Sequence, residues 1–176
     1  MKKLKNKDLQ RINIEEFKIA KKTPITIILD NVRSALNVGS VFRTSDAFLI
    51  ENIILCGITA TPPNNEIRKA ALGSTDSVNW KYVKNTTEAV QQLSKEGYHV
   101  VAIEQARKST LLNKFELPKK PIAMILGNEV NGVSQEVIDI CDEVLEIQQF
   151  GTKHSLNVSV TTGIVIWKIW EIINNN

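Results

Sequence analysis

The sequence is poor in residues that form disulfides or bind metals. Its two cysteines, Cys56 and Cys141, lie in or beside apolar runs, and neither belongs to a CxxC pair. Its two histidines, His99 and His154, are far apart in the chain. Because disulfide frameworks and zinc sites need clustered ligands, we expect no metal centre, and we expect buried thiols in a reducing cytoplasm.

The sequence also lacks a long uninterrupted apolar run. The longest apolar stretch, 158–173, contains Thr161, Thr162 and Lys168, so it is too short and too polar to cross a bilayer. No apolar segment follows the basic N-terminus, as a signal peptide would require. The Walker pattern GxxxxGK and the nucleophile elbow GxSxG are missing as well. We therefore expect a cytoplasmic protein without a membrane partner. We expect neither a Walker-type phosphate-binding loop nor a GxSxG nucleophile.

Positive charge is concentrated at the N-terminus. The chain has 176 residues and a net charge of +3, yet residues 1–22 hold eight Lys or Arg against Asp8, Glu15 and Glu16, a net charge of +5. The length and ordinary composition predict one full-sized domain. We expect a basic helical arm over 1–23 and a single domain over 24–176. The arm is suited to phosphate binding, although a solvated surface helix explains the charges equally well.

Short apolar runs alternate with helical patterns along the rest of the chain. We expect strands at 25–30, 52–57, 78–83, 98–104, 123–128 and 143–148, with helices starting near 38–40 and covering 66–72, 86–97, 134–141 and 155–173. The segment 105–120 reads as polar and irregular. This alternation predicts an α/β fold with a mostly parallel sheet and helices on both faces. In such sheets ligands bind at the carboxyl ends of the strands.

The first polar cluster at a predicted strand end lies within 30–48. Asn31, Arg33, Asn37 and Arg43 follow the strand. If Gly39 and its neighbour open the helix, their free N–H groups form an anion site, and Arg43 lies one turn away from them. An alternative is that Asn37 only caps the helix and Arg43 is a surface residue.

The second and third clusters follow later strands. Residues 125–137 crowd Asn128 and Glu129 into a turn between two glycines, where the backbone is able to approach a ligand closely. Residues 148–157 bring Ser155 and Asn157 to the start of the last helix. A plain strand–turn–helix connection, and capping of the last helix by Ser155, remain alternatives.

Taken together, the three clusters resemble a known set of motifs. NVRSALNVGSVFR (31–43), ILGNEVNG (125–132) and GTKHSLNVSV (151–160) are similar to the three motifs of the TrmH-like family of SPOUT-class RNA 2′-O-ribose methyltransferases. The segment 62–78 also resembles the family's stretch between the second and third strands. The resemblance covers about 24–173. One departure is Gln148, where the family usually has a proline that stiffens the backbone.

The resemblance implies a deep trefoil knot within about 100–173, a rare topology that no pattern in the sequence would suggest. It implies S-adenosyl-L-methionine as the methyl donor and a homodimer with the last helix in its interface. Larger relatives carry a separate RNA-binding domain, so we expect the dimer surface and the basic arm to recognise RNA here, with tRNA favoured over rRNA. Alternatives are an inactive RNA-binding relative and a nucleotide-binding protein with an accidental match.

The resemblance also implies roles for individual residues. The catalytic set would be Arg43, Asn37, Glu129, Ser155 and Asn157. The cofactor-binding set would be Glu104, Gly127, Asn128, Gly132, Ile147, Gln149, Ser155 and Leu156. The RNA-binding set would be Asn31, Arg33 and Arg43.

Overall fold

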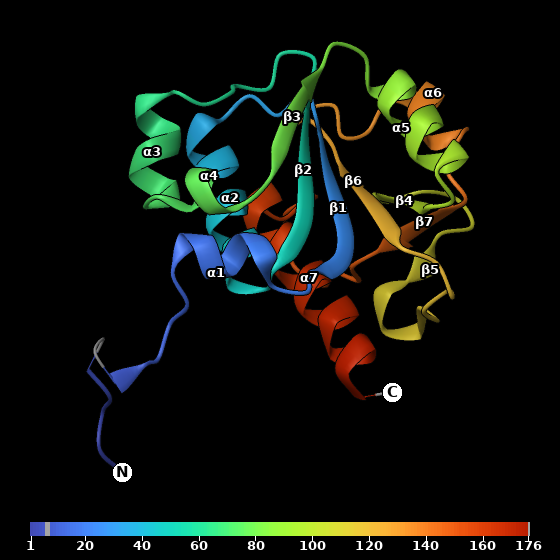
Figure 1. The fold of residues 1–176 in the computed structure, drawn as a ribbon. Coiled ribbons are helices and arrows are strands. Elements are labelled where there is room, and N and C mark those ends of the chain that lie inside the picture. Colours follow the sequence, from blue (N-terminus) through green and yellow to red (C-terminus); the bar gives the residue numbers. More distant parts are fainter. Residues whose placement is uncertain (6–7, 176) are drawn as a thin grey trace.

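The core of the molecule is one parallel sheet, seen edge-on in Figure 1, a computed structural model that describes residues 1–5 and 8–175. The seven strands have the order β3-β2-β1-β6-β4-β7-β5, and every pair is parallel. Their bounds are β1 Thr23–Asp30, β2 Ile50–Cys56, β3 Trp80–Val83, β4 His99–Ile103, β5 Thr110–Leu111, β6 Ile122–Leu126 and β7 Glu143–Glu146. The predicted parallel α/β fold is confirmed. The short β5 lies in the segment expected to be irregular.

Helices cover both faces of the sheet (Figure 1). The helices are α1 Ile14–Ile19, α2 Ala35–Ala47, α3 Asn65–Ala71, α4 Ser74–Ser77, α5 Thr86–Lys95, α6 Gln135–Ile138 and α7 Val158–Asn175. Alternate side chains of β1 face opposite cores because strand side chains alternate. Ile27 packs in the cluster that holds Phe42 of α2 and Ile166 of α7, whereas Ile28 packs in the cluster that holds Val90 of α5. These strands therefore hold their ends, and the loops that follow, in fixed positions.

The N-terminal helix is much shorter than predicted. Among the described residues of the predicted arm, the α-helix covers only Ile14–Ile19. Asn13 and Glu16 form a capping box at its start, and the Lys22 ammonium donates to the Ala20 carbonyl, 3.1 Å away, just past its end. Buried Phe17 anchors the helix on the body. Residues 8–12 are exposed, so no packed apolar face stabilises a helix there. The N-terminal end extends away from the body (Figure 1).

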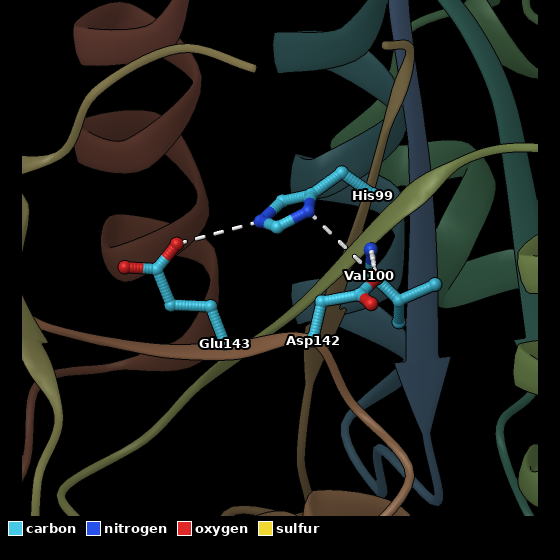
Figure 2. A network of polar contacts seen from close by, with 4 residues as sticks. All are labelled: His99, Val100, Asp142 and Glu143. Atoms are coloured by element: carbon cyan, nitrogen blue, oxygen red, sulfur yellow. Dashed lines mark hydrogen bonds and ion pairs between the residues drawn. The ribbon is translucent and has the colours of Figure 1, made fainter.

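The amino ends of β4 and β7 carry a compact polar cluster, shown in Figure 2. His99 Nε2 lies 3.4 Å from Glu143 Oε2, and His99 Nδ1 lies 3.8 Å from Asp142 Oδ2. The same Asp142 oxygen accepts the Val100 N–H at 2.7 Å. These contacts tie the starts of the two neighbouring strands together.

Within residues 1–5 and 8–175, no helix is long and apolar enough to cross a membrane. In the same part of the chain, no group of three or more His, Cys, Asp or Glu side chains is arranged to hold a metal ion.

Candidate active site

A pocket of about 650 Å³ opens at the carboxyl ends of β4, β6 and β7. Its walls come from three segments: the end of β4, the loop after β6 and the loop after β7. The predicted residues that line it are Glu104, Gly127, Asn128, Glu129, Gly132, Ile147, Gln149, Ser155, Leu156 and Asn157. The remaining predicted residues, Asn31, Arg33, Asn37 and Arg43, are not among its lining residues.

A chain of hydrogen bonds joins the three motifs at the edge of this pocket. Asn157 Nδ2 donates to Asn37 Oδ1 at 3.1 Å, and Asn37 Nδ2 donates to Glu129 Oε1 at 3.1 Å. The Glu129 carboxylate also accepts the backbone N–H groups of Arg33 at 2.8 Å and Ser34 at 3.0 Å. Segments about a hundred residues apart are thus held in one arrangement, with each amide oriented by its neighbour.

The charge of Glu129 follows from these contacts. Partial burial disfavours the ionised carboxyl, but hydrogen bonds from the N–H groups of Arg33 and Ser34, from its own N–H and from the Asn37 amide outweigh that cost. The pKa of Glu129 is therefore lowered from its ordinary value, and the side chain is a carboxylate at neutral pH.

Two glycines bring backbone against backbone at the floor of the pocket. A Cβ on Gly127 would lie 2.1 Å from the carbonyl carbon of Gly132. A Cβ on Gly132, whose φ is +66°, would lie 2.1 Å from Glu104 Oε2. That same carboxylate oxygen accepts the Val133 N–H at 3.1 Å and so fixes the loop to the end of β4. Only glycine fits these positions, because the protein's own atoms fill the space that a Cβ would take.

Asn31 and Asn128 hold the loops rather than pointing free groups at the pocket. Asn128 Nδ2 donates to the Asn31 carbonyl at 2.8 Å. The Asn31 side chain, on a residue with φ +55°, donates to Asp30 at 2.8 Å and accepts the Ile58 N–H at 3.1 Å. Both polar atoms of the Asn31 amide are thus used within the protein. A direct contact of Asn31 with RNA stays a prediction.

Helix α2 begins earlier than predicted, and this corrects the reading of the first cluster. Ser34 is the N-cap, because its Oγ accepts the Asn37 N–H at 3.3 Å, so the helix starts at Ala35. Gly39 lies inside the helix, where a Cβ would come within 2.5 Å of the Ile67 carbonyl oxygen. Its role is close packing of α2 on α3, and the predicted anion site at Gly39 is wrong.

The same shift places Arg43 about two turns into α2. It lies six residues beyond Asn37, about 9 Å further along the axis and on another face. Its side chain is exposed. Among the described residues no hydrogen bond or ion pair involving Arg43 was found. Arg43 and Asn37 therefore lie on different faces of α2, and the role of Arg43 at the site stays a prediction.

The last helix is capped by Asn157 rather than by Ser155, which was the alternative considered from the sequence. Asn157 Oδ1 accepts the N–H of Ser159 at 2.9 Å and the Ser159 hydroxyl at 2.7 Å, so α7 starts at Val158 rather than near Ser155. Asn157 therefore serves both as helix cap and as the end of the hydrogen-bond chain. Gln148 is exposed and does not line the pocket, whereas its neighbours Ile147 and Gln149 do.

Several residues of the site, among them Ser34 and Gln105, are missing from the predicted sets. Ser34 caps α2 and donates its N–H to Glu129; its position three residues before Asn37 is a signal for an N-cap. Gln105 lines the pocket and its Nε2 donates to the His154 carbonyl at 2.6 Å. No local pattern marks Gln105, because its partner lies 49 positions away.

The fold is a parallel α/β sheet with a ligand-sized pocket at the carboxyl ends of β4, β6 and β7. Proteins of this class bind small molecules at this edge of the sheet. Residues 24–167 match the SpoU rRNA Methylase family, and the chain belongs to this family. The resemblance seen in the three motifs is thereby confirmed. The implied knot stays a prediction.

Named relatives extend the comparison. An uncharacterized tRNA/rRNA methyltransferase of Borreliella burgdorferi is 30% identical over 98% of this chain and 74% of its own length. The 23S rRNA (guanosine-2′-O-)-methyltransferase RlmB of Neisseria meningitidis serogroup B is 29% identical over 81% of this chain; the aligned region spans only 56% of that relative. The crystal structure of an AdoMet-bound rRNA methyltransferase from Sinorhizobium meliloti superposes with a TM-score of 0.81 at 29% identity, covering 87% of this chain and 58% of that one.

Proposed function

We propose that this protein is an RNA methyltransferase that uses S-adenosyl-L-methionine to methylate a ribose 2′-hydroxyl. The observation that carries the proposal is the hydrogen-bond chain from Asn157 through Asn37 to Glu129, which joins all three family motifs beside one pocket. The cofactor named in the Sinorhizobium meliloti structure and the 2′-O activity named for the Neisseria meningitidis relative support it.

The pocket residues fit this cofactor. A volume of about 650 Å³ lies in the range of small-molecule sites. Gly127 and Gly132 expose backbone on one wall, while Ile147 and Leu156 supply apolar surface on another. These residues would hold the cofactor, which supplies an electrophilic methyl group when bound. Glu104 would keep the glycine loop in place.

The polar residues would position the ribose. The Glu129 carboxylate is saturated with donors, so its role is to fix the Asn37 amide rather than to accept a proton from the substrate. Asn37 and Asn157 then form a pre-oriented pair beside Ser155, and holding a nucleophile in place removes a large part of a reaction barrier. Arg43 cannot act as a literal base, because a guanidinium stays protonated. Its role would be to orient a phosphate and stabilise the developing alkoxide.

The outer face of α7 supports a homodimer. Val160, Ile164 and Trp167 lie on one side of the helix and are 51%, 39% and 53% exposed. Leu36 of the neighbouring α2 is 50% exposed. Arg43 follows Leu36 by seven residues and therefore lies on the same face of α2. A second copy seated on this face would bring Arg43 to the boundary between the chains, so we propose that Arg43 serves the partner's pocket.

Mixing two inactive variants tests this arrangement. Arg43→Ala is expected to keep cofactor affinity and to lose about 10²- to 10³-fold in methyl transfer, as removal of a charge-stabilising donor does. Ser155→Trp, at an exposed position in the pocket lining, is expected to block the pocket and leaves Arg43 intact. If Arg43 acts across the dimer, subunit exchange between the two variants restores activity at one site per mixed dimer. If Arg43 acts within its own chain, the mixture stays inactive, and a monomer in sedimentation would contradict the dimer itself.

Transfer of a labelled methyl group to RNA tests the function directly. Purified protein, tritiated cofactor and bulk tRNA or rRNA are incubated, and the modified nucleoside is identified by mass spectrometry. We expect a 2′-O-methylated nucleoside, with tRNA as the first candidate substrate and rRNA as the second. Cofactor binding without transfer to either RNA would favour an inactive RNA-binding relative. Absence of cofactor binding by calorimetry would overturn the proposal.

The basic N-terminal arm is proposed to bind RNA phosphates. Five net positive charges over 1–22 release counterions when they meet a polyanion, so RNA affinity is expected to fall steeply with salt. Removing residues 1–12, which contain five Lys or Arg and one Asp, should reduce the slope of log affinity against log salt by about 2–4 while leaving cofactor affinity unchanged. An unchanged slope would assign RNA binding to the body of the protein.

A further inference from the structure

Phe150 is an apolar side chain that does not contribute to the core of the fold. It lies in the loop 147–157 after β7 and is 88% exposed. Among the large hydrophobic side chains of the described residues, only Met1 has a larger exposed fraction. Phe150 belongs to neither core cluster. A single exposed apolar residue is ordinary on a protein surface, so its surroundings decide whether it has a function.

The loop holds Phe150 at the rim of the pocket. Its neighbour Gln149 lines the pocket, as does Ser155 further along the loop. The loop is tied to the segment after β4 by the bond from Gln105 Nε2 to the His154 carbonyl. A Cβ on the next residue, Gly151, would meet no atom within 4 Å outside its chain neighbours, so no other segment packs against the loop there. The aromatic ring is therefore free to meet a molecule that occupies the mouth of the pocket.

Apart from Glu104, whose carboxylate accepts the N–H groups of Gln105 and Val133, the two loops that are joined here carry only positive charge. Residues 105–110 and 147–157 contain Arg107, Lys108 and Lys153 and no Asp or Glu. All three cations are exposed. Exposed cations in the same two loops as an exposed aromatic ring form a combination that suits single-stranded nucleic acid, in which phosphates meet the cations and a base stacks on the ring.

We propose that Phe150 is a substrate-positioning residue on which an unpaired nucleobase of the RNA stacks while the ribose is held at the pocket. The inference rests on the proposed function, because it takes RNA as the substrate. Because Phe150 directly follows the pocket-lining Gln149, the stacked base is that of the target nucleotide or of its neighbour. A base inside a duplex has no free face, and the substrate is therefore an unpaired segment.

Binding of short RNAs tests the stacking without any methyl transfer. A single-stranded 12-nucleotide RNA of mixed sequence and an abasic ribose-phosphate 12-mer are compared by fluorescence anisotropy. Phe150→Ala is expected to weaken binding of the base-bearing RNA about 5- to 150-fold, the range for loss of one stacked base, and to leave the abasic affinity unchanged. Because the side chain is exposed, the variant should fold normally, which a thermal melt checks.

Three further variants separate stacking from other contacts. Phe150→Trp keeps an aromatic face and should bind within about 3-fold of the native chain, because stacking tolerates a change of ring. Phe150→Leu keeps apolar surface without an aromatic face and should lose as much affinity as Phe150→Ala. Leu72→Ala removes a side chain that is 67% exposed at the far end of α3, and should change nothing.

The outcomes distinguish this inference from the proposed function. Native-like binding by Phe150→Ala, native-like binding by Phe150→Leu, or a change of oligomeric mass in Phe150→Ala would each overturn it, the last by assigning Phe150 to a contact between chains. Methyl transfer with no dependence on Phe150 would reject the stacking alone. Base-dependent binding that requires Phe150, in a protein that methylates no RNA, would support the stacking and reject the methyltransferase.

Discussion

The two edges of the sheet both carry polar clusters, but they are built for different purposes. At the amino edge, His99, Asp142 and Glu143 come from two neighbouring strands and bond to each other and to a strand N–H. At the carboxyl edge, Glu129, Asn37 and Asn157 come from three loops and surround one side of a pocket.

The difference lies in what the hydrogen bonds hold. The amino-edge contacts join β4 to β7, so these polar atoms already have partners within the protein. The carboxyl-edge contacts hold loops that are separated by a pocket of about 650 Å³. A cluster of titratable groups alone therefore does not indicate a ligand-binding site. An open pocket beside the cluster is the more informative feature.

The largest effect should come from filling the carboxyl-edge glycine. Gly132→Ala places a Cβ against Glu104 and forces a side chain onto a left-handed backbone, which together cost about 2–5 kcal/mol. We expect at least about 100-fold lower cofactor affinity by calorimetry, since the glycine loop must move. Gly97→Ala near the amino edge is the matched control: φ is +87° but the space is open, so backbone strain alone is expected, with unchanged cofactor affinity. Equal loss of affinity in both variants would remove the distinction between the edges.

Exchange of one polar group at each edge should have the next largest effect. Glu129→Gln replaces a charged acceptor of three hydrogen bonds, each worth about 1.5–3 kcal/mol, and puts an amide donor against backbone N–H groups. We expect kcat/KM for RNA to fall about 10- to 150-fold. His99→Gln at the amino edge should leave kcat/KM within about 2-fold, because it lines no part of the pocket. A large loss of kcat/KM in His99→Gln would show that both edges serve the reaction.

The smallest effect concerns acid stability. Because the pKa of Glu129 is lowered in the folded chain, its carboxylate contributes stability that is present above its ordinary value of 4.5 and is lost as the pH falls through the folded pKa. Urea unfolding of the native chain and of Glu129→Gln should therefore differ at pH 7 and converge in acid. The part that depends on pH should be below about 1 kcal/mol, since the group is largely exposed. A difference that grows in acid would contradict the lowered pKa.

Prediction from local sequence succeeded for strand interiors and failed at some helix boundaries. Strand interiors such as Ile27 and Ile125 were predictable because buried parallel strands require continuous apolar runs. The start of α2 was placed too late because Gly39 looked like a helix opening, whereas its true reason is the Ile67 carbonyl packed against it. That contact crosses between helices and leaves no local mark. Asn157 was expected at the site, but the sequence did not show whether Asn157 or Ser155 caps α7.

The sequence by itself determined the parallel α/β class and the three polar clusters at strand ends, because strand periodicity and parallel pairing bring those ends to one edge. It also carried the motifs that identify the family. Only the tertiary structure decided which polar atoms meet. Asn157, Asn37 and Glu129 have partners 92 to 120 positions away, and Arg43 is separated from them by the rise of a helix that starts earlier than its glycine suggests. Such choices depend on distances between segments rather than on neighbours in the chain, and folding alone sets those distances.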